Sequence, residues 1–247
     1  MPIRRLALAL LLLATPAAAE PCRGTLYLTI DTGWMSEAEQ IADVLRRQQV
    51  KATLFIADER TFRGDTTLSD SWADFWRARV AEGHAFGSHT LRHWYFRADP
   101  DPAHVTYQSF DRRQSTTLDQ QQLCAELQAP GERLRTMTGA SLTPGLWRAP
   151  GGGATPNAKK FAAACGFTRH ERWSDAGFLG DELPSERYPN RALLARALAS
   201  IKDGDVLMMH WGIRSRREKF AAVLEPLIVG LKERGFCFAT LAERGAP

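Results

Sequence analysis

The sequence predicts an α/β fold whose parallel strands close into a barrel. Short apolar runs typical of buried strands alternate with amphipathic helical segments along the chain. The 247-residue length and the hydrophobic content of 44% suit one domain with a large core. Because strand-helix alternation implies parallel strands joined by right-handed crossovers, the seven strand-like runs favour closure into a barrel. An open doubly wound sheet is the alternative fold.

The N-terminus has the three parts of a secretory signal: a basic pair, an apolar run over 6–14 and small residues ending at Ala19. The apolar run is shorter than the roughly 20 residues that a membrane-spanning helix requires, so no stable membrane insertion is expected. We expect a signal peptide over 1–19 and a single domain over 20–247, exported to the periplasm or secreted. Loss of the basic pair lowers the formal charge from +4 to +2, which is too small to indicate a nucleic-acid partner.

The four cysteines, Cys22, Cys124, Cys165 and Cys237, would all remain in the exported chain, where disulfides persist. Cys22 precedes the first predicted strand and Cys237 lies within the last, so we favour a bridge between these two. Buried free thiols are the alternative. Metal binding by cysteine is disfavoured, because no two cysteines have the close spacing of a ligand pair.

The first part of the chain is predicted to contain three strands separated by two helices. Ser36 and Glu39 have the spacing of a capping box that would begin the first helix. The spacing of Trp72, Phe75 and Trp76 predicts the second helix. The predicted strands are 26–30, 52–56 and 85–88, and the predicted helices are 36–47 and 72–82.

The segment over 99–122 is polar, rich in glutamine and without a clear period. We expect it to be an irregular excursion over the mouth of the barrel. The helix that follows carries Leu123 and Leu127, and Pro130 is expected to break or restart it because proline lacks the N–H that an interior position donates. Gly139 is the expected end of this helix.

The last part of the chain continues the alternation. Thr155 is a predicted N-cap with Pro156 at the first helical position, and Gly166 ends that helix. Two further helices are predicted over 192–201 and 220–234. The predicted strands are 146–147, 167–173, 206–209 and 236–240.

Polar residues of catalytic types follow the strands at the point where each one ends. They are Asp31, His89, Arg148, the acidic loop 175–181 and His210. In a parallel barrel these positions share the C-terminal face, where the active sites of such barrels lie. A chance scatter of polar residues would not repeatedly fall at strand ends, so one catalytic site is favoured over separate structural roles.

His89 and His93 are four residues apart and can bind one divalent metal ion, with Zn²⁺ as the expected species. A bound Zn²⁺ lowers the pKa of its water to about 7 and polarises a carbonyl group. Two histidines at this spacing are common in proteins, so the spacing alone is only suggestive of a metal site. The polar residues at the other strand ends strengthen this interpretation. The sequence therefore predicts a site for a divalent metal ion.

Four short segments resemble ordered motifs of the NodB-type polysaccharide deacetylases, which form carbohydrate esterase family four. Segment 29–33 reads Thr-Ile-Asp-Thr-Gly and is similar to the first motif, Thr-Phe-Asp-Asp-Gly, while segment 89–93 matches the second, His-Ser/Thr-x-x-His. Segments 148–151 and 207–210 are similar to the third and fifth motifs. The resemblance covers about 25–241. It implies a distorted (β/α)7 barrel and a metal-dependent hydrolase that removes N-acetyl, or O-acetyl, groups from a glycan.

The chain departs from the family pattern in two motifs, the first and the fourth. In the family the first Asp of the first motif is the base and the second is a metal ligand, but this chain has Thr32 at the second position. The usual set of two histidines and one aspartate is therefore incomplete. The fourth motif, Asp-x-x-Asp-Trp, is only loosely similar to segments 173–175 and 180–182.

The resemblance also implies roles for the other strand-end residues in amide hydrolysis. Asp31 would take the proton of the attacking water, and His210 would donate a proton to the departing nitrogen. Arg148 would keep Asp31 ionised and oriented. Either Asp181 or Asp175 would orient His210 and raise its pKa.

The expected partner is a glycan, and aromatic side chains suit its recognition because flat apolar faces stack on sugar rings. The tryptophans within a few residues of a motif are expected to line the barrel mouth. They are Trp94, Trp147, Trp173 and Trp211. Trp72 and Trp76 lie four apart on one helix and are expected in the core.

Two other functions remain compatible with the sequence. One is a metal-independent amide hydrolase on the same barrel, and the other is a catalytically inactive glycan-binding protein. Thr32 favours both alternatives. The presence of Asp31, Arg148 and His210 disfavours the inactive protein.

Overall fold

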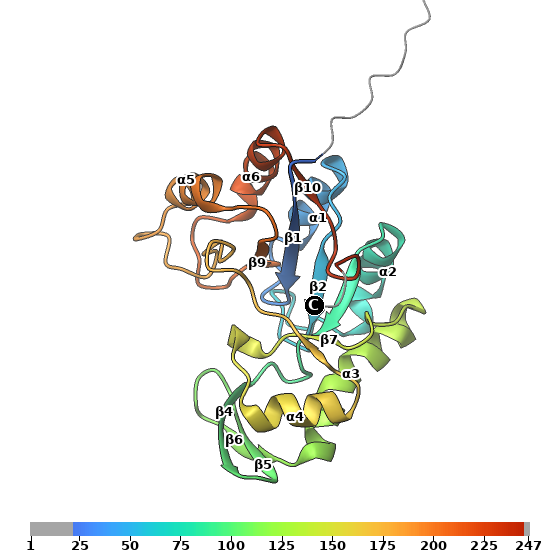
Figure 1. The fold of residues 1–247 in the computed structure, drawn as a ribbon. Coiled ribbons are helices and arrows are strands. Elements are labelled where there is room, and N and C mark those ends of the chain that lie inside the picture. The colour runs from blue at the N-terminus through green and yellow to red at the C-terminus, as the bar shows by residue number, and fades with distance from the viewer. Residues whose placement is uncertain (1–21, 245–247) are drawn as a thin grey trace, which may run out of the picture.

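A curled sheet of seven parallel strands forms the centre of the computed structural model, which describes residues 22–244. The predicted signal peptide over 1–19 lies outside the described residues. The strands are β1 (Gly24–Asp31), β2 (Thr53–Ile56), β3 (Ala85–Ser88), β7 (Leu146–Trp147), β8 (Arg169–His170), β9 (Val206–His210) and β10 (Phe236–Phe238). Their order is β10-β1-β2-β3-β7-β8, and β9 also pairs with β1. This arrangement confirms the predicted α/β fold class, as a curled half-barrel (Figure 1).

Six α-helices accompany the described strands (Figure 1). They are α1 (Ala38–Arg47), α2 (Ala73–Ala81), α3 (Gln120–Thr138), α4 (Pro156–Ala164), α5 (Asn190–Ser200) and α6 (Ala221–Glu233), with short 3₁₀ turns at Asp70–Trp72 and Pro150–Gly152. Side chains alternate between the two faces of a strand, so Leu26, Leu28 and Ile30 of β1 pack in the main core with residues of α1 and α6. Thr29 and Asp31 consequently face the inside of the curled sheet. None of the helices in residues 22–244 is long and apolar enough to cross a lipid bilayer.

The chain after β8 connects the far edge of the sheet to β9. Ser174 N donates a hydrogen bond to the Val206 carbonyl, and Met208 N donates to the Gly177 carbonyl. Phe178 forms an isolated parallel bridge with Met208. The strand predicted over 167–173 is therefore much shorter than expected, because its second half leaves β7 to reach β9.

The polar segment between β3 and α3 is a small antiparallel sheet, so the prediction of an irregular excursion was wrong. Its strands are β4 (Tyr95–Asp101), β5 (His104–Gln108) and β6 (Ser115–Leu118). Val105, Tyr107 and Leu118 are buried and pack with Leu123 of α3 and Phe161 of α4. The sheet lies beyond the C-terminal ends of the parallel strands, beside α4 (Figure 1). Burial alternates along β5, which is the two-residue period of a strand with one covered face.

Helix α3 continues through Pro130, so the predicted break is also wrong. Its buried apolar side chains are spaced by three or four residues and form one continuous face. They are Leu123, Leu127, Pro130, Leu134 and Met137. Proline in a helix interior costs about 3 kcal/mol, and packing along the whole face offsets this cost.

The predicted capping box at Ser36 does not form, because α1 begins two residues later and the Ser36 hydroxyl instead accepts a hydrogen bond from Lys219 Nζ at 3.2 Å. A capping box is present at the start of α3. There Asp119 accepts from the backbone N of Gln122, and the Gln122 side chain accepts from the backbone N of Asp119.

The four cysteines form two disulfides, so none of them is free. Cys22 is bonded to Cys237, which confirms the predicted bridge between the start of β1 and β10. Cys124 of α3 is bonded to Cys165, at the end of α4. The second bridge joins the two helices that support the small antiparallel sheet.

Candidate active site

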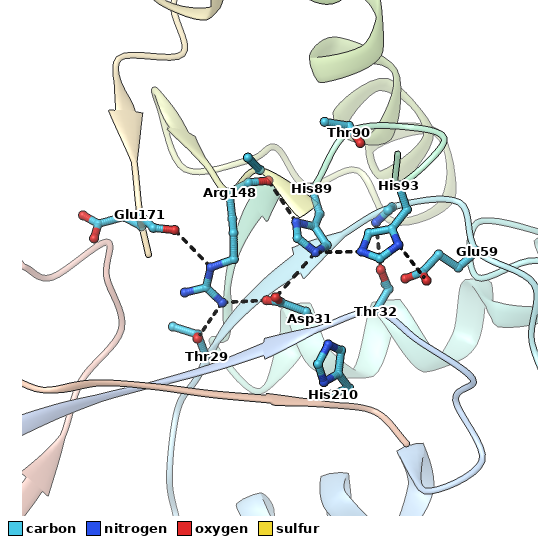
Figure 2. A network of polar contacts seen from close by, with 12 residues as sticks. Thr29, Asp31, Thr32, Glu59, His89, Thr90, His93, Arg148, Glu171 and His210 are labelled. Carbon is cyan, nitrogen blue, oxygen red and sulfur yellow. Dashed lines mark hydrogen bonds and ion pairs between the residues drawn. The ribbon is translucent and has the colours of Figure 1, made fainter. Parts of the chain in front are cut away.

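Four of the strand-end residues predicted from the sequence meet at the C-terminal edge of the curled sheet: Asp31, His89, Arg148 and His210 (Figure 2). Asp31 ends β1 and His210 ends β9, and the parallel register pairs these two residues directly. His89 follows β3 and Arg148 follows β7, and these strands are also neighbours. The parallel topology therefore brings together residues that are far apart in the sequence.

Asp31 and Arg148 form a buried ion pair, with Arg148 Nη1 2.6 Å from Asp31 Oδ1. Arg148 also donates hydrogen bonds to Thr29 Oγ1 at 2.8 Å and to the Glu171 carbonyl at 3.0 Å. Burial raises the pKa of Asp31, but the charges of Arg148 and the protonated His210 outweigh this effect and lower it. Asp31 is thus an ionised carboxylate in a fixed orientation, with Oδ1 occupied by Arg148.

The imidazole rings of His89 and His93 face each other through their Nε2 atoms, which are 3.2 Å apart. His89 Nδ1 donates to the Arg148 carbonyl at 2.9 Å, and His93 Nδ1 lies 3.1 Å from Glu59 Oε1. Because carbonyl and carboxylate oxygens only accept hydrogen bonds, each neutral ring carries its proton on Nδ1. Both Nε2 atoms then present lone pairs to the same point, and Asp31 Oδ2 lies 3.5 Å from His89 Nε2.

The pKa values of His89 and Glu59 agree with this assignment of the protons. Burial lowers the pKa of His89 to about 4, so its ring is neutral at physiological pH. Burial raises the pKa of Glu59, but its contact with the His93 ring outweighs this effect and lowers it to about 2. Glu59 is therefore a carboxylate that holds the Nδ1 proton of His93.

This donor set fits a divalent metal ion through two imidazoles. Metal-binding histidines usually donate the other ring N–H to a carboxylate or a backbone carbonyl, and His89 and His93 have one partner of each kind. Thr32 supplies no carboxylate, and its hydroxyl accepts a hydrogen bond from Ala57 N at 3.2 Å. Within residues 22–244, no group of three or more His, Cys, Asp or Glu side chains is arranged to hold a metal ion.

His210 is held by Asp181 rather than by Asp175, which the sequence left as an alternative. Asp181 Oδ2 accepts from the His210 backbone N at 2.7 Å and lies 3.1 Å from His210 Nδ1, whereas Asp175 is exposed. Burial lowers the pKa of His210, but the charge and hydrogen bond of Asp181, with those of neighbouring carboxylates, raise it to about 10. His210 is therefore a protonated imidazolium at neutral pH.

The backbone that carries the histidine pair is strained. Thr90 and His93 have φ values of 63° and 54°, in the left-handed region that non-glycine residues rarely adopt. The surrounding side chains hold this loop: the Tyr107 hydroxyl is hydrogen-bonded to Thr90 Oγ1 at 2.9 Å. Glu126 of α3 accepts from both the backbone N and the Nε of Arg92, at 3.1 Å and 2.6 Å.

The expectation that four tryptophans line the mouth is wrong for two of them. Trp147 and Trp211 are 1% and 0% exposed and pack within the hydrophobic core. Trp94 and Trp173 are partly buried. Trp72 and Trp76 are buried in the core as predicted.

Glu59 is a site residue that the sequence analysis did not identify. It lies three residues after Ile56, the last residue of β2. The strand-end pattern that identified Asp31 and His89 applies equally to β2. That pattern was the available signal, and no motif residue at this strand drew attention to it.

A profile of the family described as "Polysaccharide deacetylase" matches residues 18–170, which is more than half of the chain. The chain belongs to the polysaccharide deacetylase family. The predicted family and the predicted deacetylase class of hydrolase are confirmed by this membership. No curated protein matches the chain in sequence.

Solved structures of carbohydrate esterase family four share the fold at low sequence identity. The Xyl-CE4 domain of a multidomain xylanase from the hindgut metagenome of Trinervitermes trinervoides has a TM-score of 0.65 and 18% identity, covering 89% of this chain and 88% of that domain. The peptidoglycan deacetylase PdaC from Bacillus subtilis has a TM-score of 0.64 and 17% identity, covering 91% of each chain. BA3943 from Bacillus anthracis, a pseudoenzyme of the family, has a TM-score of 0.63 and 19% identity, covering 91% of this chain and 66% of that protein.

Proposed function

We propose that this protein is an exported, metal-dependent hydrolase that removes N-acetyl, or O-acetyl, groups from a glycan. One observation carries the proposal: an ionised carboxylate, two converging imidazole nitrogens and a protonated histidine surround the same point. The Asp31 carboxylate lies 3.5 Å from His89 Nε2, and β1 and β9 place Asp31 and His210 side by side. Hydrolysis of an acetamide needs a base, an electrophile and an acid, and these groups suit those roles.

Asp31 would act as the base toward the attacking water. Its Oδ1 is occupied by Arg148, so Oδ2, on the side of the histidine pair, is the oxygen free to take the proton. Arg148 keeps this carboxylate ionised and oriented. A divalent ion held by His89 and His93 would activate the water and polarise the acetyl carbonyl.

His210 would act as the acid toward the leaving group. Its pKa of about 10 keeps the proton on the ring at neutral pH. Asp181 occupies Nδ1, so Nε2 is the nitrogen available to donate. An amine leaves poorly unless it is protonated, whereas an alkoxide needs less help. A histidine held in its protonated form is therefore suited to N-acetyl rather than O-acetyl substrates.

Thr32 supports a second candidate, a glycan-binding protein without catalytic activity. The hydroxyl removes one negative charge from the place where the family resemblance implies a metal ligand. A pseudoenzyme is present among the structures with the same fold, and a mutant of that pseudoenzyme has restored activity. Thr32→Asp is therefore the informative substitution in this chain.

Acetate release from a panel of N-acetylated and O-acetylated glycans tests the proposal, with chelator-treated and Zn²⁺-loaded protein compared. We expect release by the loaded protein and loss of release after chelation. Full activity of demonstrably metal-free protein would favour the metal-independent hydrolase. Release by Thr32→Asp but not by the parent would favour the inactive glycan-binding protein. Fractionation of cells producing the chain with and without residues 1–19 tests export.

A further inference from the structure

Glu59 stands beside the histidine pair on the loop after β2. Its Oε1 lies 3.1 Å from His93 Nδ1, and its Oε2 is buried without a hydrogen-bond partner among the described residues. A buried, unpartnered carboxylate oxygen costs free energy unless a cation is near. The loop therefore keeps an anionic group directly behind the His93 ring, with one of its two oxygens left unpaired.

The charges around the histidine pair explain why an anion is needed there. Two carboxylates contact the pair in the part of the chain that the structure describes, Asp31 and Glu59. The charge of Asp31 is already balanced by Arg148 at 2.6 Å, and Thr32 is neutral. Glu59 has no arginine or lysine partner within 4.0 Å among residues 22–244. It is thus the one unbalanced negative charge in contact with the pair.

We propose that Glu59 is a positioning residue for the metal ion: it holds His93 with Nε2 turned toward His89 and supplies, from behind the ring, the negative charge that Thr32 lacks. The inference rests on the metal dependence of the proposed function. Glu59 acts through His93 and does not bind the ion itself, because its oxygen contacts the nitrogen on the other side of the ring. Carboxylates placed in this way typically raise metal affinity 10- to 100-fold.

The same arrangement defines the class of ion. Both groups facing the ion at the pair are neutral imidazoles, which suit Zn²⁺ and similar late transition metals. Mg²⁺ and Ca²⁺ prefer carboxylate and carbonyl oxygens and are expected to bind weakly. The site should therefore select Zn²⁺ over Mg²⁺ more strongly than a site with an aspartate ligand at position 32.

Competition of the purified protein with a chromophoric zinc chelator tests this inference without any enzyme assay. Glu59→Gln keeps the size of the side chain and removes its charge, and we expect zinc affinity to fall roughly 10- to 100-fold. Glu39→Gln is the matched control, because Glu39 is a 71% exposed glutamate on α1, and its zinc affinity should equal that of the parent. A Glu59→Gln protein within about twofold of the parent, or a parent without measurable zinc affinity, would overturn the inference.

A double-mutant cycle separates action through His93 from a general charge effect. In a His93→Ala background, Glu59→Gln should change zinc affinity little, because the ring through which Glu59 acts is gone. An equal loss in both backgrounds would show that Glu59 acts directly on the ion, and would overturn the inference.

Glu59→Asp retains the charge but withdraws the carboxylate from the ring by one methylene, so it should also weaken binding. If circular dichroism shows that Glu59→Gln is unfolded, Glu59→Asp takes its place in the test. A zinc affinity of Glu59→Asp equal to that of the parent would refute the positioning role. Acetate release is read separately. If zinc affinity depends on Glu59 but the protein releases no acetate, only the proposed function is contradicted. If the protein releases acetate but its zinc affinity does not depend on Glu59, only this inference is contradicted.

Discussion

Asp181→Asn should move the alkaline limit of activity to lower pH. The Asp181 carboxylate lies 3.1 Å from His210 Nδ1 and also accepts from the His210 backbone N at 2.7 Å. Asparagine has the same shape, and its oxygen can still accept the backbone hydrogen bond. The substitution therefore removes mainly the negative charge that stabilises the His210 imidazolium.

The direction and size follow from the pKa of His210. An acid catalyst is active only while protonated, so the rate falls as pH rises through its pKa, which is about 10 in the parent. Without Asp181 the pKa should fall toward the usual 6.5 of histidine. At pH 8 a histidine with that pKa is protonated in only about 3% of molecules, so the loss at pH 8 reaches about 30-fold in the limit. The remaining charges of Asp31 and Glu182 reduce this shift.

The assay is kcat/KM for acetate release between pH 5 and 11, measured on one N-acetylated oligosaccharide at saturating Zn²⁺. Asp175→Asn is the control, because Asp175 is an exposed acidic residue of the same loop and should leave the profile unchanged. If Asp181→Asn lowers activity equally at all pH values and its alkaline limb stays at the position of the parent, the assignment of His210 as the acid is refuted.

Three further substitutions test the remaining roles. Asp31→Asn cannot take a proton, so acetate release should fall by about 10²- to 10⁴-fold, and a folded variant within a few-fold of the parent would remove Asp31 from the base role. Arg148→Met leaves Asp31 buried without its partner charge, so urea unfolding should show a loss of about 3–5 kcal/mol; a loss under about 1 kcal/mol would mean that the pair contributes little to stability. His210→Ala should slow N-acetyl substrates more than matched O-acetyl esters, since an alkoxide needs less help to leave, and equal losses on the two would exclude the acid role.

Much of the fold and the centre of the candidate site could be predicted from local patterns in the sequence. Apolar runs fixed the positions of the parallel strands, and parallel strands necessarily place their C-terminal ends at one edge. Asp31, His89, Arg148 and His210 were found in this way, and the structure brings them together (Figure 2). Their chemical roles stay predictions until the substitutions above are measured.

The errors arose where long-range packing decides the local structure. Helix α3 passes through Pro130 because its buried face is continuous, and a propensity argument does not include that packing. The choice between Asp181 and Asp175 depends on how the loop after β8 turns toward β9, which spacing does not reveal. Glu59 was missed because a single acidic residue after a strand is common, and only its contact with His93 distinguishes it.

The strained loop between His89 and His93 has a consequence for how an ion would be captured. Two non-glycine residues in left-handed conformations each cost roughly 1–3 kcal/mol, and the contacts of Tyr107 and Glu126 offset this cost in the protein alone. The histidines are therefore ordered before any ion arrives, so binding requires little loss of conformational entropy. Hydrogen exchange of the amides in this loop should be nearly the same with and without zinc, and the antiparallel sheet that carries Tyr107 keeps the loop in the shape that an ion would use.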